Sequence, residues 1–247
     1  MFTSSKSGRS GSGTYVMATA FLSLFAIVGF ALYGLPFFYD FWEKDFGWSR
    51  GFITSGNALS KIVVAPLFGY IAGWIIDRYG PRKMLLAGSV IAGAALIGLG
   101  FMSSVFMFYF FYFLNAAGYV FGGPLPCQVL ISRRFEKNRG RAMGIAYLGI
   151  GAGGVIVPHL SAALVSHSGW HTALVSLGVL MILIALPLAF FIKETAPGVQ
   201  PEGANSSDEK LRNILSDRNF YSLLSAACVQ LLQSVEQTSI LNCTCAI

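Results

Sequence analysis

One basic residue stands where the chain is otherwise apolar. Lys61 follows Asn57 by one helical turn, inside an apolar run over about residues 51–75 that is long enough to cross a membrane. A charge at the centre of a membrane helix costs about 2.5 to 3.5 kcal/mol on insertion scales, and such residues are usually functional. The apolar runs hold no acid to neutralise Lys61, whereas an anionic substrate, with Asn57 on the same helix face, would do so. Two other interpretations stay open: Lys61 bonds to backbone carbonyls between helices, or burial deprotonates it.

A histidine is the second candidate for chemistry. His159 follows Pro158 in a later apolar run, and an imidazole exchanges a proton near neutral pH. We therefore expect it either to carry a coupling proton or simply to hydrogen-bond within the bundle. An enzyme using His159 and His167 is a competing class, but eight residues across a helix end do not form a catalytic constellation. The sequence has no phosphate loop, nucleophile elbow, metal-ligand cluster or carboxylate pair, which favours a protein that is not an enzyme and needs no cofactor and no metal.

Composition indicates the elements that must position these residues. Of 247 residues, 55% are hydrophobic and only 11% are charged, and the mean hydropathy is +0.64. Since a soluble domain has about a quarter charged residues, this is a membrane protein, with room for six or seven spans of about 20 residues. We predict an all-α membrane protein, a six-transmembrane-helix bundle with a partial seventh helix. The six helices are expected at about residues 15–39, 51–75, 84–102, 105–131, 142–165 and 172–192.

Details within these helices give further expectations. Pro36 would free a carbonyl and kink the first helix, which is expected to end where a polar loop begins at Asp40. Gly149 and Gly153 have the spacing that brings helices into contact. The aromatic run over residues 106–113 is expected to face lipid.

Charge placement predicts the topology and the domain bounds. Fourteen of the 17 Lys and Arg residues fall on one side if the N-terminus is cytoplasmic, and only Lys44 and Arg50 fall in outer loops. We expect a disordered cytoplasmic tail at residues 1–14, the six-helix domain at 15–192, a cytoplasmic linker at 193–219, and a partial seventh helix at 220–247. The positive charge is read as topology, so no nucleic acid partner is expected.

A polar turn separates the second predicted helix from the third. Residues 73–83 read G-W-I-I-D-R-Y-G-P-R-K. Gly73 suits close approach of two helices, Gly80 suits a positive φ, and Pro81 suits the first position of the next helix. Asp77 is expected to pair with Arg78 or Arg82, or to lie against a helix N-terminus.

This turn resembles the signature loop of the major facilitator superfamily of secondary transporters, G-x-x-x-D-R-x-G-x-R-K, apart from Pro81, where a basic residue is usual. In that family the loop is a conformational latch on the cytoplasmic side that holds two halves of the transporter together. The resemblance assigns to the latch Gly73, Asp77, Arg78, Gly80, Arg82, Lys83, Arg139 and Arg141.

Further segments are similar to the monocarboxylate and oxalate/formate antiporter branch of this superfamily. They are Pro36, F-G-W-S-R at 46–50, Pro66 before Gly69, Arg133 to Gly144, and Gly169-Trp170. The resemblance implies transport of small organic anions, with a proton as a symporter or in exchange as an antiporter. It departs at Phe37, where animal monocarboxylate carriers have a lysine, and at His171, where an arginine is usual.

The resemblance also implies a substrate site and a larger whole. Family members place the first and fourth helices at the cavity, so the candidate substrate residues beside Asn57 and Lys61 are Tyr33, Asn115, Tyr119 and Gln128, with helix-to-helix hydrogen bonding as the alternative for each. A full transporter has twelve helices in two halves, and this sequence supplies the first. We expect a truncated product in the plasma (inner) membrane. A half-size carrier that forms a homodimer and a non-transporting membrane scaffold are the alternatives.

Overall fold

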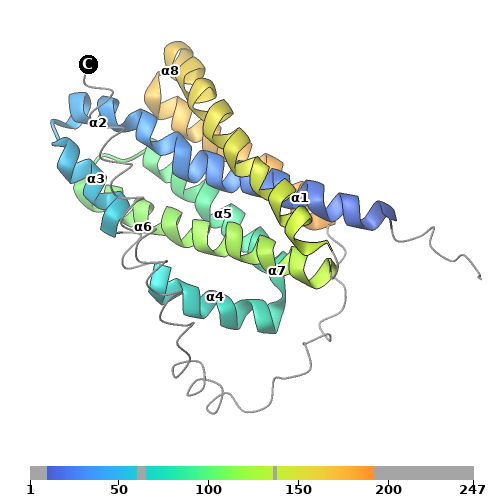
Figure 1. The fold of residues 1–247 in the computed structure, drawn as a ribbon. Helices are drawn as coiled ribbons and strands as arrows, with labels where there is room; N and C mark the ends of the chain where they lie inside the picture. The colour runs from blue at the N-terminus through green and yellow to red at the C-terminus, as the bar shows by residue number, and fades with distance from the viewer. Residues whose placement is uncertain (1–9, 60–64, 136–137, 192–247) are drawn as a thin grey trace, which may run out of the picture. The chain divides into compact units, whose positions relative to one another are not determined.

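The structure is a computed structural model, and it describes residues 10–59, 65–135 and 138–191, all within one compact unit, Met1–Thr195. Every regular element in the described residues is a helix (Figure 1). The predicted all-α fold is therefore confirmed. Lys61 lies outside the described residues. The predicted linker, the predicted seventh helix and most of the predicted tail lie outside them too, so the bounds of these three segments stay predictions.

The first predicted helix changes its winding part-way along. It consists of α1 (Ser10–Val28), the π-helical η1 (Gly29–Gly34), the 3₁₀-helical η2 (Leu35–Phe38) and α2 (Tyr39–Phe46). The change falls at Pro36, which cannot donate a hydrogen bond and whose ring crowds the carbonyl four residues earlier. The expected irregularity is thus at the expected proline.

The loop expected from Asp40 is wrong, because the helix continues to Phe46 and ends at Gly47, whose φ is +66°. Tyr39 and Trp42 explain the extension. They lie three residues apart on one helix face and are both buried, so continuing the helix buries two large aromatic rings.

The described residues of the second to fourth predicted helices form five elements. They are α3 (Arg50–Leu59), α4 (Ala65–Tyr79), α5 (Pro81–Gly100), α6 (Val105–Gly122) and α7 (Pro124–Arg134). Residues 60–64, between α3 and α4, lie outside the description. Gly123 separates α6 from α7 with φ −85° and ψ −137°, and Pro124 then begins α7. Gly123 therefore interrupts the fourth predicted helix.

The fifth and sixth predicted helices form one element, α8 (Arg139–Phe191), which doubles back at Gly169 (Figure 1). Gly169 has φ +75°, a value that favours glycine, and it separates two helical arms. Trp170, the next residue, donates its indole N–H to the Asp45 carboxylate near the end of α2.

Four described segments are long and apolar enough to cross a membrane. They are Tyr15–Phe46, Pro81–Gly100, Val105–Arg134 and Arg139–Ala185. The last has 47 residues, about twice the length a bilayer needs, and the reversal at Gly169 makes it two arms. The second predicted helix is described only in two shorter pieces, α3 and α4, because residues 60–64 lie outside the described residues.

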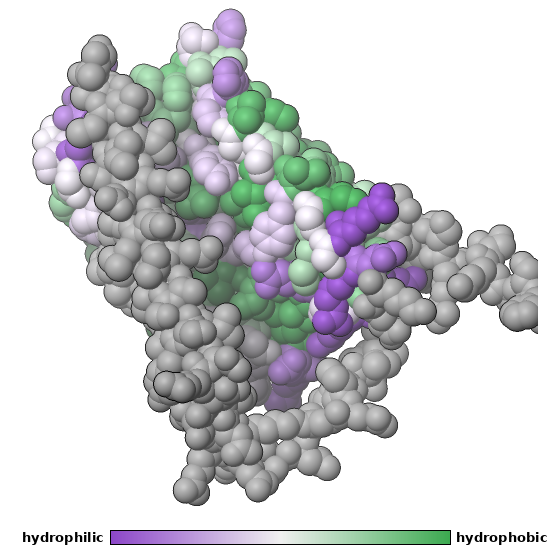
Figure 2. All heavy atoms as spheres, in the orientation of Figure 1, coloured by the Kyte–Doolittle hydropathy of each residue, from purple (hydrophilic) through white to green (hydrophobic). Residues whose placement is uncertain are grey.

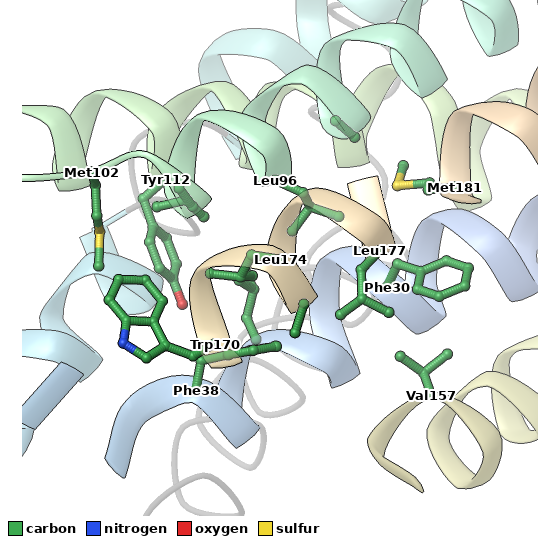
Figure 3. Close-up of a cluster of buried hydrophobic side chains, with 14 of the residues drawn as sticks. Phe30, Phe38, Leu96, Met102, Tyr112, Val157, Trp170, Leu174, Leu177 and Met181 are labelled. Atoms are coloured by element: carbon green, nitrogen blue, oxygen red, sulfur yellow. The ribbon is translucent and has the colours of Figure 1, made fainter. Parts of the chain in front are cut away.

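The core forms where α5, α6, α8 and the first helix meet. Figure 3 shows Phe30, Leu96 and Leu177 from three of these elements directed into one buried cluster. At several crossings the backbones themselves touch: a Cβ built on Gly149 would lie 2.3 Å from the carbonyl oxygen of Phe21, and one on Gly153 would lie 2.8 Å from the Cα of Gly29. The helix contact expected of this glycine pair is therefore confirmed.

The aromatic run of α6 has two faces. Phe106 is 78% exposed and Phe110 is also exposed, as expected of lipid-facing rings, whereas Phe108 and Tyr112 are buried. The Tyr112 hydroxyl lies 2.7 Å from the Tyr39 hydroxyl. The expectation of a wholly lipid-facing run is wrong for these two residues, because a helix turns four-residue neighbours toward the same side.

The surface in Figure 2 is hydrophobic over the middle of the helices, and hydrophilic side chains gather where α7 meets the start of α8. A second polar group lies near the end of α2. There Arg50 pairs with Asp40 and, at 3.2 Å, with Glu43, and the hydrogen bond that Arg50 donates to the Asp40 carboxylate raises the pKa of Arg50 above its ordinary value. Charge at the helix ends and apolar surface between them is the pattern of a membrane-spanning bundle.

Candidate functional site

The turn between α4 and α5 has the backbone that its sequence predicts. Gly80 has φ +83° and donates its N–H to the Ile76 carbonyl at 3.0 Å, which closes α4. Pro81 is the first residue of α5. Gly73 differs from expectation, because a Cβ built there meets nothing within 4 Å in the described part of the chain, so a close helix approach at Gly73 is not seen.

Asp77 reaches across to another turn. Its carboxylate lies 4.0 Å from the Arg133 guanidinium, in the last turn of α7. Arg78, one of the expected partners, lies instead over the rings of Trp74, at 5.4 Å, and Tyr79. The ion pair therefore joins the α4–α5 turn to the α7–α8 turn.

The remaining basic residues of the predicted latch surround these two turns. Arg82 lies in the first turn of α5, and the Lys83 ammonium lies 5.9 Å from the centre of the Tyr79 ring. Arg139 donates to the carbonyls of Ser132, at 3.0 Å, and Phe135, at 3.4 Å, and so satisfies acceptors at the end of α7. Arg141 is exposed in the first turn of α8.

Separating Asp77 from Arg133 is expected to change the stability of the protein little. The two side chains are 80% and 39% exposed, and exposed pairs contribute about 0 to 1 kcal/mol. In a double-mutant cycle of Asp77→Asn and Arg133→Gln, followed by thermal unfolding in detergent, we expect a coupling energy below about 1 kcal/mol. A coupling above about 2 kcal/mol would show that water does not reach this pair.

A second group of polar residues comes from four different elements, and two of its members, Tyr33 and Gln128, are exposed. Tyr33 on η1 and Tyr147 on α8 are both electrostatic neighbours of Tyr119 on α6. Gln128 on α7 donates its amide N–H to the Tyr147 hydroxyl. The Tyr33 ring also lies 3.6 Å from a Cβ built on Gly154 of α8. Three of the six predicted substrate residues thus come together from different elements, and Tyr147 joins them.

The other candidates lie apart from this group or have a different role. Asn115 is 5% exposed and donates its amide N–H to the Ala31 carbonyl at 3.1 Å. Asn57 is half-buried on α3. His159 is exposed on α8 and its Nδ1 lies 2.8 Å from the Val155 carbonyl, one turn earlier on the same helix.

Two residues of these groups escaped the sequence-based prediction. Arg133 follows Asp77 by 56 positions, and Tyr147 follows Gln128 by 19. Neither pair has a local spacing that indicates contact. A signal was present for each, since Arg133 lies in a basic segment and Tyr147 is a polar ring in an apolar run.

Comparison with known proteins decides the family. The family model of the Major Facilitator Superfamily matches residues 19–240. The chain belongs to this superfamily. The predicted family is thus confirmed, and the apolar helices are those of an integral membrane protein in a transporter family, not an enzyme family.

Individual relatives in the superfamily are similar over part of their length. Monocarboxylate transporter 4 of Rattus norvegicus is 26% identical over 84% of this chain and 46% of its own. A probable sulfoacetate transporter of Cupriavidus necator is 32% identical over 51% of this chain and 29% of its own. Relatives named for riboflavin or multidrug efflux also match, so membership in the superfamily does not by itself define the substrate.

A solved structure supports the fold. The crystal structure of the POT family transporter PepTSo superimposes with a TM-score of 0.58 over 73% of this chain and 37% of its own, at 21% identity. The chain therefore has the helical fold of superfamily transporters and spans less than half the length of these relatives.

Proposed function

We propose that this chain is part of a secondary active transporter for small organic anions such as monocarboxylates. The observation that carries the proposal is the group formed by Tyr33, Tyr119, Gln128 and Tyr147, which we call the tyrosine–glutamine cluster. Phenol and amide groups donate hydrogen bonds to carboxylates. The apolar runs hold Lys61 and no acid, so an anion is the charged solute that this environment favours.

The names of two relatives support the same class. A monocarboxylate and sulfoacetate are both organic anions, and they are the solutes named for two of the matching proteins. Because the chain spans 46% and 29% of these relatives, the rest of the substrate site would come from a second six-helix half, in the same polypeptide or in a second copy.

Alternating access would use the two turns joined by Asp77 and Arg133. In this proposal they face the cytoplasm of a plasma (inner) membrane protein, as the distribution of Lys and Arg predicts, and act as the latch. His159 is the proposed group for a coupling proton, because its imidazole is exposed on α8 and an imidazole can both accept and donate a proton.

Binding of radiolabelled lactate to the purified protein in detergent tests the substrate class, and uptake into liposomes then tests transport. We expect unlabelled sulfoacetate to compete with the label and choline, an organic cation, not to compete. Tyr147→Phe removes one hydroxyl of the tyrosine–glutamine cluster and is expected to weaken binding by about threefold to tenfold, the value of one hydrogen bond. Tyr15→Phe, at an exposed position near the start of α1, is the matched control. Equal competition by choline, or no lactate binding, would refute the proposal.

A further inference from the structure

One hydrogen bond ties the π-helical segment of the first helix to α6. The amide of Asn115 donates to the carbonyl of Ala31, which lies inside η1 and is 84 residues away in sequence. Asn115 is almost fully buried, and its Oδ1 has no hydrogen-bond partner in the described part of the chain. Among the described residues, the hydrogen bond to the Ala31 carbonyl is therefore the polar contact of the Asn115 side chain.

The segment that receives this bond is wound irregularly. A π-helical turn is rare, and here it is followed by a 3₁₀ turn that contains Pro36. An α-helix could not continue unchanged through Pro36, since the proline lacks an N–H. Because other windings of residues 29–38 would satisfy the same proline, contacts from outside the helix must select this one.

Those contacts come from two sides. On the side of α8 they are apolar and close: Gly29 lies against Gly153, and a Cβ built on Gly34 would lie 3.3 Å from the Val157 side chain. On the side of α6 the directional contact is the bond from Asn115. Apolar contacts allow a helix to rotate, whereas a hydrogen bond to one named carbonyl fixes the register.

The direction of the Tyr33 ring depends on this register of η1. Tyr33 lies two residues after Ala31 in the same π-helical segment, and its ring rests beside Gly154. A change from π to α winding would rotate the residues that follow it, and would turn the Tyr33 ring away from Gly154 and Tyr119.

We infer that Asn115 is a positioning residue, which sets the winding of η1 and thereby aims Tyr33, and is not a substrate contact. The inference rests on the proposed function only where it treats Tyr33 as a residue that binds substrate. The geometric part can be tested without any substrate.

Disulfide trapping measures the geometry directly. In a background with the four native cysteines replaced, Tyr33→Cys and Gly154→Cys place two thiols at the contact between η1 and α8. We expect rapid cross-linking with a mild oxidant when residue 115 is asparagine. Asn115→Leu, which has a similar volume and no donor, is expected to slow cross-linking by about threefold to tenfold, as loss of one buried hydrogen bond implies.

Ser89→Ala is the matched control. Ser89 is as deeply buried on the neighbouring α5, but among the described residues its hydroxyl bonds within its own helix alone, to the Leu86 carbonyl at 2.9 Å. Its loss should leave cross-linking unchanged. If Asn115→Leu does not fold, Asn115→Ala removes the same donor without adding bulk.

The results separate the possibilities. Unchanged cross-linking in the Asn115 variants, equal slowing in Ser89→Ala, or no cross-link when residue 115 is asparagine would each overturn the inference. None of these outcomes depends on substrate. Failure of lactate to bind would refute the proposed function and leave the positioning role of Asn115 intact.

Discussion

The Gly88→Ala variant is expected to lose most of its folded protein. A Cβ built on Gly88 would lie 2.2 Å from the backbone nitrogen and 2.5 Å from the Cα of Gly122, at the crossing of α5 and α6. Backbone atoms cannot rotate away as a flexible side chain can, so the two helices would have to separate. Overpacking typically costs about 1 to 3 kcal/mol, and we expect a loss at or above the upper end of that range. Thermal unfolding in detergent and the yield of monodisperse protein measure it.

Gly144→Ala is the control for this variant. It makes the same chemical change on α8, where a Cβ meets nothing within 4 Å in the described residues. Alanine is favoured over glycine inside a helix by about 1 kcal/mol, so this variant should be as stable as the parent or slightly more stable. Similar melting temperatures for the two alanine variants would contradict the close approach of α5 and α6.

The Lys61→Ala variant is expected to bind lactate at least about tenfold more weakly, because a charge-assisted hydrogen bond contributes about 1.5 to 3 kcal/mol. The sequence supports this expectation, since Lys61 is the only charged residue within the predicted apolar run over residues 51–75. Asn57, one turn earlier, is half-buried on α3. Equilibrium binding of radiolabelled lactate to the variant gives the change in Kd.

Lys61→Arg keeps the positive charge and should retain most of the affinity. Thermal stability separates a role in binding from a role in packing: removing a buried charge that only bonds to backbone carbonyls would change the melting temperature and leave the affinity unchanged. An unchanged Kd in Lys61→Ala would remove this residue from the substrate site.

The features that sequence predicted well are those set by local chemistry. Long apolar runs define the helices because the membrane requires internal hydrogen bonding. Gly80 and Pro81 make the α4–α5 turn because their backbone preferences are their own. The Gly149 and Gly153 pair predicted a close crossing because only small residues allow one.

The features that escaped prediction depend on which helices become neighbours. Asp77 pairs with Arg133 and not with Arg78, because the α4–α5 turn lies beside the end of α7. Asn115 donates a hydrogen bond to Ala31, and Gln128 donates one to Tyr147, for the same reason. A single sequence states which polar groups need partners, but the packing of the helices selects the partners.

The bond from the Trp170 indole to Asp45 has a mechanical consequence. It joins the reversal in α8 to the end of α2, so the second arm of α8 is attached to the first helix. Separating these two helices at this end would leave the indole N–H without its acceptor, so the bond opposes their splaying there.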